Sequence, residues 1–241
     1  SQQQRLKVVF DGVDTTLFRP QSWSGDVELQ GETAEQSLRL KRDARVLSYA
    51  TRGMEPLRGF PEFMRMLPAL MQRFSDLEVV VAGRDLVAYS YPAPSHGGSW
   101  KQRLLAELGD KLDWSRLHFT GLLNYGDYVR LLQRSDLHAV LSRPYVTSWG
   151  LFQAAACGSK LLLNRDPSIN YVLTEQEALW VDLDQPKQQE VTVTQWLEAA
   201  FERRNTSNRS LLKPEWELNR CLERWQKLLN QAMVSQAASG L

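Results

Sequence analysis

Short apolar runs alternate with segments of helical spacing from about residue 45 onward. The apolar runs read, in order, ARVLSYA, LEVVVAG, RLHFTG, DLHAVLS, SKLLLN and ALWVDL. The intervening segments with apolar residues at helical spacing are residues 60–74, 99–109, 125–135 and 148–158. Continuous apolar strands that alternate with helices are typical of a parallel sheet covered on both faces. The pattern therefore predicts one doubly wound, Rossmann-like α/β domain.

The ends of several predicted helices carry their own signals. Ser99 is suited to begin one helix and Gly109 to end it, whereas Pro68 is expected to kink or split the first helix. Two further helices are predicted near the end of the chain, over 192–204 and 214–233. One stripe of the last helix is apolar and consists of Leu218, Leu222, Trp225 and Leu229. We expect this stripe to pack on this domain or on another one rather than on a membrane.

The first 44 residues lack the regular alternation. The run LKVVF predicts a short buried strand that ends at the turn DGVD. Residues 20–43 are polar and lack strand periodicity, so they predict a surface connection leading into a short helix near 34–40. The resulting organisation is a strand and turn at 1–20, a surface connection at 21–44, the Rossmann-like domain at 45–212 and a terminal helix at 213–241.

Composition narrows the classes of function. The chain has 241 residues, of which 43% are hydrophobic and 24% charged, and its net charge is +1. Such a balance gives no electrostatic basis for nucleic acid as the main partner. No apolar run approaches the ~20 residues needed to span a bilayer, which leaves a peripheral membrane contact open. Cys157 and Cys221 suit neither a disulfide framework nor a metal site, so we expect a reduced, cytoplasmic setting.

Two loops at strand ends carry candidate chemistry, because ligands of such sheets bind at the carboxyl ends of the strands. The loop TRGMEPLRGF brings Arg52 and Arg58 around a glycine, and guanidinium groups bind phosphate bidentately. The alternative is two surface arginines in a polar loop. The segment VTSW precedes a helix whose N-terminus could hold a phosphate, with Ser148 as N-cap. Gln153 lies within that helix, where a glutamine is often simply solvent-facing.

Standard catalytic motifs are absent from the sequence. It contains no G-x-S-x-G, no Walker P-loop and no G-x-G-x-x-G after the first strand, which disfavours a Rossmann dehydrogenase. His118 and His138 fall in predicted strands and are expected to be packed in the core, whereas His96 lies in a loop. We therefore assign no catalytic residue and expect a ligand-binding half of an enzyme.

Several of these segments together resemble the C-terminal, donor-binding domain of family 4 glycosyltransferases with the GT-B architecture. DGVDTTLFRP is similar to the family's NGVD segment at the crossing between its two domains. TRGMEPLRGF resembles the GR…KG element, and YVTSWGLFQAAACG resembles the E-x7-E element. The resemblance implies that residues 1–20 form the interdomain crossing and residues 45–212 the donor-binding domain. It also implies a preceding Rossmann-like domain, and a start at SQQQR rather than Met fits a segment of a longer protein.

The resemblance assigns roles to individual positions. Those expected to bind the diphosphate are Arg52, Gly53, Arg58, Ser148 and Trp149. Gln153 is expected at the ribose, and the base pocket is expected at Gly83, Leu122 and Leu123. Tyr145 and Thr147 are expected near the donor sugar. The implied activity is transfer of a sugar from a nucleotide-sugar to an acceptor, with retention of configuration and without cofactor or metal.

The sequence departs from the family pattern at both glutamate positions, which are Tyr145 and Gln153 here. An amide keeps an acceptor oxygen but loses the charge, so each bond to the ribose weakens by about 1 kcal/mol. A degenerate nucleotide-binding or scaffold domain without turnover is therefore the alternative. In either case the chain alone is expected not to transfer sugar. The sequence leaves the base, the sugar and the acceptor open.

Overall fold

The computed structural model describes residues 7–92, 98–143, 147–202 and 209–239. The described residues form a six-stranded parallel sheet with strand order β5-β4-β3-β6-β7-β8. Its strands are β3 (Arg45–Gly53), β4 (Leu77–Arg84), β5 (Leu117–Gly121), β6 (Leu137–Val140), β7 (Leu161–Asn164) and β8 (Leu179–Val181). They coincide with the six apolar runs, and the predicted doubly wound α/β domain is confirmed.

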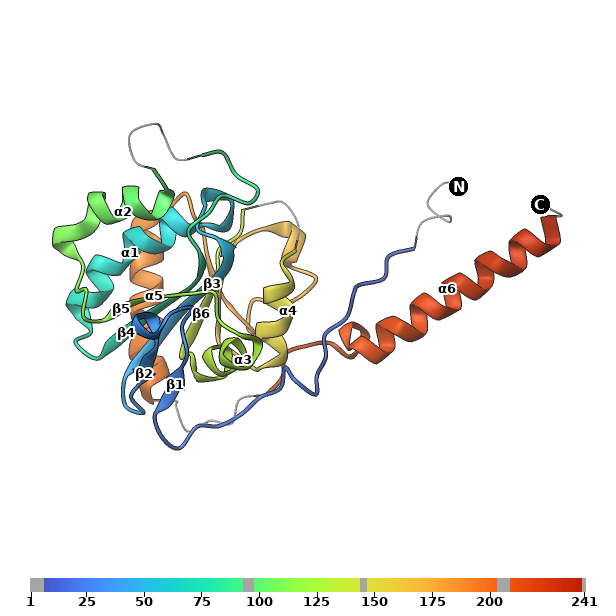
Figure 1. The fold of residues 1–241 in the computed structure, drawn as a ribbon, viewed down its shortest axis with the longest axis horizontal. Coiled ribbons are helices and arrows are strands. Elements are labelled where there is room, and N and C mark those ends of the chain that lie inside the picture. Colours follow the sequence, from blue (N-terminus) through green and yellow to red (C-terminus); the bar gives the residue numbers. More distant parts are fainter. Residues whose placement is uncertain (1–6, 93–97, 144–146, 203–208, 240–241) are drawn as a thin grey trace.

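Helices cover both faces of the sheet (Figure 1). They are α1 (Phe60–Arg73), α2 (Trp100–Leu108), α3 (Tyr125–Arg134), α4 (Trp149–Ala156), α5 (Pro186–Glu202) and α6 (Leu218–Ser239). Short 3₁₀ turns are η2 (Ala34–Gln36), η3 (Pro56–Arg58), η4 (Gly109–Lys111), η5 (Pro167–Ile169) and η6 (Pro214–Trp216). The largest apolar core lies between the sheet and α1, α2 and α5. A second core lies between the opposite face and α3 and α4. Because successive strand residues point to opposite faces, Leu47 joins the first core while Val46 faces the other side.

The strand order reverses between β3 and β6, which are neighbours in the sheet although they are far apart in the sequence. From β3 the chain adds strands toward β5, and from β6 it adds strands toward β8. The carboxyl ends of β3 and β6 therefore border the crevice in which ligands of doubly wound sheets bind. The loops after these two strands are the ones that the sequence singles out.

Residues 20–43 differ from the prediction. They form an antiparallel hairpin of β1 (Val27–Leu29) and β2 (Leu38–Leu40), with Val27 opposite Leu40. The hairpin packs on the sheet beside α3, and its buried apolar residues face Val46 and Leu131. The predicted surface connection and the predicted helix at 34–40 are wrong, apart from the 3₁₀ turn η2. Strands of three residues show too little alternation to be recognised in the sequence.

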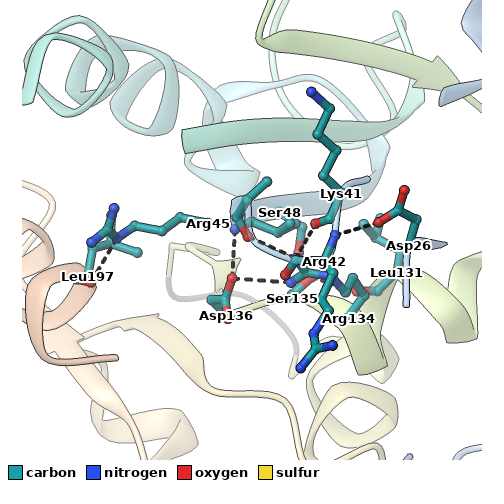
Figure 2. A network of polar contacts seen from close by, with 12 residues as sticks. Asp26, Lys41, Arg42, Arg45, Ser48, Leu131, Arg134, Ser135, Asp136 and Leu197 are labelled. Carbon is teal, nitrogen blue, oxygen red and sulfur yellow. Dashed lines mark hydrogen bonds and ion pairs between the residues drawn. The ribbon is translucent and has the colours of Figure 1, made fainter. Parts of the chain in front are cut away.

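A buried arginine anchors this hairpin at the amino end of the sheet (Figure 2). Arg134, the last residue of α3, donates to the backbone carbonyl oxygens of Lys41, Arg42 and Ala44 at 2.8 to 3.1 Å. Its other nitrogen lies 3.2 Å from the carboxyl group of Asp136, which also accepts the N–H of Val46. One side chain therefore connects β2, the start of β3 and the start of β6.

Other boundaries also depart from the predictions. Residues 7–10 form no strand, and Val8 is 81% exposed. Val13, just after them, makes an isolated parallel bridge to Glu217. Pro68 does not split α1, although a proline at this position cannot donate the usual helical hydrogen bond. The buried apolar face of α1 holds the helix against the sheet despite this loss. Helix α5 begins at Pro186, six residues before the predicted start.

Helix α6 extends away from the rest of the molecule (Figure 1). Trp216 and Cys221, near its beginning, are buried, but most of its apolar stripe is exposed in this chain. The exposed members of the stripe are Leu222, Trp225 and Leu229, and Met233 further along the helix is exposed as well. The stripe thus does not pack on this domain beyond the first turn. None of the described helices has both the length and the hydrophobicity needed to cross a bilayer.

Candidate diphosphate-binding site

The loop after β3 lies against the segment that follows β6. It runs through η3 to Gly59, which has a φ of +70°. A β-carbon at Gly59 would overlap the carbonyl oxygen of Leu141, at the end of β6. Glycine therefore allows the start of α1 to lie directly against the loop that follows β6. The N–H of Arg143 in that loop donates to the carbonyl oxygen of Leu57 at 2.9 Å.

Arg52 and Arg58 both contact Tyr89, a residue for which the sequence predicts no role. Nη1 of Arg52 donates to the hydroxyl of Tyr89 at 3.1 Å, and the guanidinium of Arg58 lies 5.1 Å from the centre of the same ring. Arg58 also donates to the hydroxyl of Ser142, after β6, at 3.3 Å. Within the described residues, no carboxyl group forms an ion pair with either arginine. The pair keeps N–H donors available for an anion.

The position of Tyr89 depends on two buried residues of the β3 loop. Gly53 is buried at the end of β3, where a β-carbon would lie 2.6 Å from the carbonyl oxygen of Leu86. Glu55 is 0% exposed, and its Oε2 accepts the N–H groups of Ala88, Tyr89 and Ser90 at 2.8 to 2.9 Å. Gly53 thus allows close packing beneath the loop that carries Tyr89, and its expected role at the diphosphate stays a prediction.

Helix α4, the next element after β6, begins at the same edge of the sheet. Ser148 is the N-cap residue, as predicted, but its hydroxyl makes no capping hydrogen bond. Trp149 is 69% exposed. Gln153 is half-buried and its Oε1 accepts the hydroxyl of Tyr128, on α3, at 3.2 Å. The alternative of a simply solvent-facing glutamine does not hold, because the amide faces α3.

The positions expected near the donor sugar are partly described. Tyr145 lies outside the described residues. The hydroxyl of Thr147 lies 3.0 Å from that of Tyr171. Arg143 pairs with Glu62 at 2.7 Å and with Asp184 at 3.2 Å, and the hydrogen bond that it donates to Glu62 is the main cause of its raised pKa. The charge of Arg143 is therefore held within the protein, unlike that of Arg52 and Arg58.

The expected base pocket lies at the ends of β4 and β5. Gly83 has a φ of +127°, and a β-carbon there would overlap the carbonyl oxygen of Thr51, so it keeps β4 close to β3. Leu123 packs in the core beside the hairpin, whereas Leu122 is 50% exposed. The N–H of Leu122 donates to Oε2 of Glu32, from the hairpin, at 3.0 Å. Glu32 thus borders this area, and no periodicity in its segment reveals it.

The described histidines are structural. His138 is fully buried, lies 2.7 Å from the hydroxyl of Ser48, and has a pKa that burial lowers to about 4. His118 is half-buried and lies 2.6 Å from Glu78. His96 lies outside the described residues. In the described part of the chain, no cluster of three or more His, Cys, Asp or Glu side chains could hold a metal ion.

Comparisons with known proteins bear on the fold. No protein-family model matches the chain, and no curated protein sequence does either. Among solved structures, sucrose-phosphate synthase from Thermosynechococcus elongatus is similar, with a TM-score of 0.68 at 13% identity over 95% of this chain. The C-terminal domain of a glycosyl transferase group 1 family protein, LpcC from Francisella tularensis, has a TM-score of 0.62 at 13% identity. That likeness covers 86% of this chain and 100% of the other.

The fold is that of a glycosyltransferase C-terminal domain. A third similar structure is Anabaena HepE in complex with UDP-glucose, with a TM-score of 0.55 at 14% identity over 93% of this chain. The chain spans 53% of the sucrose-phosphate synthase and 57% of HepE. At these identities the likeness is one of fold, and the expected GT-B C-terminal architecture is confirmed.

Proposed function

We propose that this chain is the nucleotide-sugar-binding domain of a glycosyltransferase. The observation that carries the proposal is the arginine pair at the reversal of strand order. Arg52 and Arg58 share Tyr89 as a contact, and no described carboxyl group neutralises either guanidinium. A diphosphate supplies the negative charge and the pairs of acceptor oxygens that planar guanidinium groups bind.

In the proposed reaction, the full protein transfers a sugar from a nucleotide diphosphate to an acceptor without a metal. The leaving diphosphate gains negative charge as the glycosidic bond to it breaks, and the two guanidinium groups stabilise that charge. The N–H groups at the start of α4 supply a further partial positive charge. The acceptor is proposed to bind a second Rossmann-like domain, since this chain spans only 53% of the sucrose-phosphate synthase and 57% of HepE. Retention of configuration is proposed from the family resemblance alone.

The proposed ribose contact is Gln153. Its amide oxygen already accepts the hydroxyl of Tyr128, so the N–H₂ group and the second lone pair of the oxygen are the groups offered to a ribose hydroxyl. Because the amide oxygen of Gln153 is already engaged by Tyr128, the alternative function is also favoured, in which the domain binds nucleotide weakly as a scaffold without turnover. The two functions differ in whether nucleotide-sugars bind and react in the full protein.

Calorimetric titration of the chain with UDP, GDP and ADP and with their glucose or mannose conjugates tests the proposal. We expect one nucleotide diphosphate to bind with a Kd in or below the millimolar range, and Arg58→Ala to abolish that binding. Arg73→Ala is the matched control, because Arg73 ends α1 at the opposite edge of the sheet, where it pairs with Glu198. Absence of heat for all of these ligands would contradict the proposal. In the full protein, sugar transfer is expected to persist in EDTA.

A further inference from the structure

Tyr89, in the segment that follows β4, makes separate contacts with both members of the arginine pair. Arg52 donates to the hydroxyl of Tyr89 at 3.1 Å, and its guanidinium carbon lies 6.0 Å from the ring centre. Arg58 approaches the ring more closely, at 5.1 Å. The face of an aromatic ring is negative, so it attracts both cations and reduces their mutual repulsion. One side chain thus holds two like charges near each other.

The loop is fixed in place from below. Glu55, in the loop after β3, accepts three consecutive backbone N–H groups, those of residues 88–90, with one buried oxygen. The hydroxyl of Ser90 in turn accepts the N–H of Leu57 at 2.8 Å. These bonds join the two loops around the buried Glu55 carboxyl group. Tyr89 is therefore attached to the segment that carries Arg58, and its position relative to the arginines is set by the backbone.

A free arginine side chain samples many rotamers, and a ligand that binds it must order it. Immobilising a side chain of this kind costs about 0.5 to 1.5 kcal/mol on binding, and pre-organisation removes part of that cost. The hydroxyl of Tyr89 engages one of the five N–H groups of Arg52, and the ring engages Arg58 without using its N–H groups. A phosphate can therefore bind both guanidinium groups while Tyr89 stays in place.

We propose that Tyr89 is a positioning residue of the diphosphate site, which holds Arg52 and Arg58 ready for the ligand, and that Glu55 anchors its loop. This inference rests on the proposed function and adds to it the residue that pre-organises the arginine pair. Tyr89 is 43% exposed, so its ring is not part of the core.

The test is a titration of the chain with inorganic pyrophosphate. We expect Tyr89→Ala to weaken binding about five- to tenfold, because both arginine contacts disappear. Tyr89→Phe keeps the ring and loses the hydroxyl, so its expected loss is about two- to threefold. Tyr91→Ala is the matched control, since Tyr91 lies in the same loop, is 66% exposed and packs against Trp100. It is expected to bind pyrophosphate as the wild type does.

A second measurement separates a positioning role of Tyr89 from a general loosening of its loop. In the Arg52→Ala background, which keeps Arg58, removal of Tyr89 should cost less affinity than it does in the wild type, because only one of its two arginine contacts is left to lose. Glu55→Gln should speed hydrogen exchange at the amides of residues 88–90 and weaken pyrophosphate binding in the same direction as Tyr89→Ala. Equal losses on removal of Tyr89 with and without Arg52 would overturn the inference.

The outcomes for the two proposals are distinct. If the wild type binds pyrophosphate, Arg58→Ala loses it and Tyr89→Ala binds as well as the wild type or better, the role of Tyr89 is refuted while the site stands. If the wild type binds neither pyrophosphate nor any nucleotide diphosphate, or Arg58→Ala binds normally, the proposed function fails and the role of Tyr89 fails with it.

Discussion

Arginine side chains lie at both ends of β3, and the two groups are held in different ways. At the amino end, Arg134 is 8% exposed and its N–H groups meet three backbone carbonyl oxygens and the carboxyl group of Asp136 (Figure 2). At the carboxyl end, the partners of Arg52 and Arg58 among the described residues are two hydroxyl groups and one ring. The contacts at the amino end hold the hairpin and the sheet together, while those at the carboxyl end leave the arginines able to bind an anion.

This difference separates two uses of the same residue type. A buried guanidinium must be matched by acceptors and opposite charge, because an unmatched buried ion is costly. An arginine that binds a ligand has to keep donors unsatisfied until the ligand arrives, and it therefore stays partly exposed. The neighbours of an arginine, rather than its place in a motif, show which use applies. Variants at the two ends should accordingly affect different measurements.

The largest effect is expected for Arg134→Met. Methionine removes the charge and all the donors, which leaves the carboxyl group of Asp136 and the three carbonyl oxygens without this partner. Removal of one member of a buried ion pair costs about 3 to 5 kcal/mol, so urea unfolding should show a loss of that size. Arg39→Met is the control, since Arg39 is 66% exposed and its ion pair with Asp26 should contribute less than about 1 kcal/mol. Equal losses for the two variants would show that Arg134 does not anchor the hairpin.

The amino end should also give the chain a dependence of stability on pH. His138 is bonded there to Ser48, and burial lowers its pKa from 6.5 to about 4. Between these values the unfolded chain binds a proton that the folded chain does not, so stability falls as the pH decreases from 6.5 toward 4. The loss attributable to His138 is about 3 kcal/mol.

Urea unfolding of the wild type and of His138→Asn across this pH range measures that contribution. Asparagine keeps a polar atom near Ser48 but does not titrate, so the variant should lose less stability on acidification than the wild type. Identical pH profiles would mean that groups other than His138 account for the dependence.

The strands of the sheet and the helices that cover it could largely be predicted from the sequence. The six buried strands are continuous apolar runs, and their helices show clear spacing, so local patterns were sufficient for the fold class. The hairpin and the contacts of Arg134 could not be predicted in this way. The hairpin strands have three residues each, and Arg134 reaches carbonyl groups more than 80 residues away along the chain. Such contacts depend on how the elements assemble.

At the carboxyl end, Arg58→Ala should lower nucleotide affinity without a matching loss of stability. Hydrogen bonds to charged groups contribute about 1.5 to 3 kcal/mol, so the affinity should fall at least about tenfold. Arg58→Lys keeps the charge but loses the planar donors, and an intermediate loss is expected. The melting temperature should stay near that of the wild type, because Arg58 is not an ion-pair partner in the core. A large drop in melting temperature would place Arg58 with Arg134 as a structural residue.

The candidate site was only partly predictable for a related reason. Arg52 and Arg58 follow a strand and flank glycines, a local signal that the sequence makes visible. Tyr89 contacts the two arginines from more than 30 residues away along the chain, and Glu55, which lies in the arginine loop, accepts the N–H of Tyr89. The one hint was a pair of tyrosines in a loop directly after a buried strand. The proposed ribose, base and sugar positions stay predictions.

The smallest effect is expected for Gln153→Glu. A glutamate can still accept the hydroxyl of Tyr128, and it offers a ribose hydroxyl a charged acceptor in place of a neutral one. The gain of about 1 kcal/mol corresponds to roughly fivefold tighter nucleotide binding, measured by calorimetry. Inorganic pyrophosphate lacks a ribose, so its affinity should not rise. Tighter binding of the nucleotide alone would support a ribose site at Gln153. Weaker binding of both ligands would mean that the added charge repels the diphosphate instead. Gln153 would then not be a ribose contact.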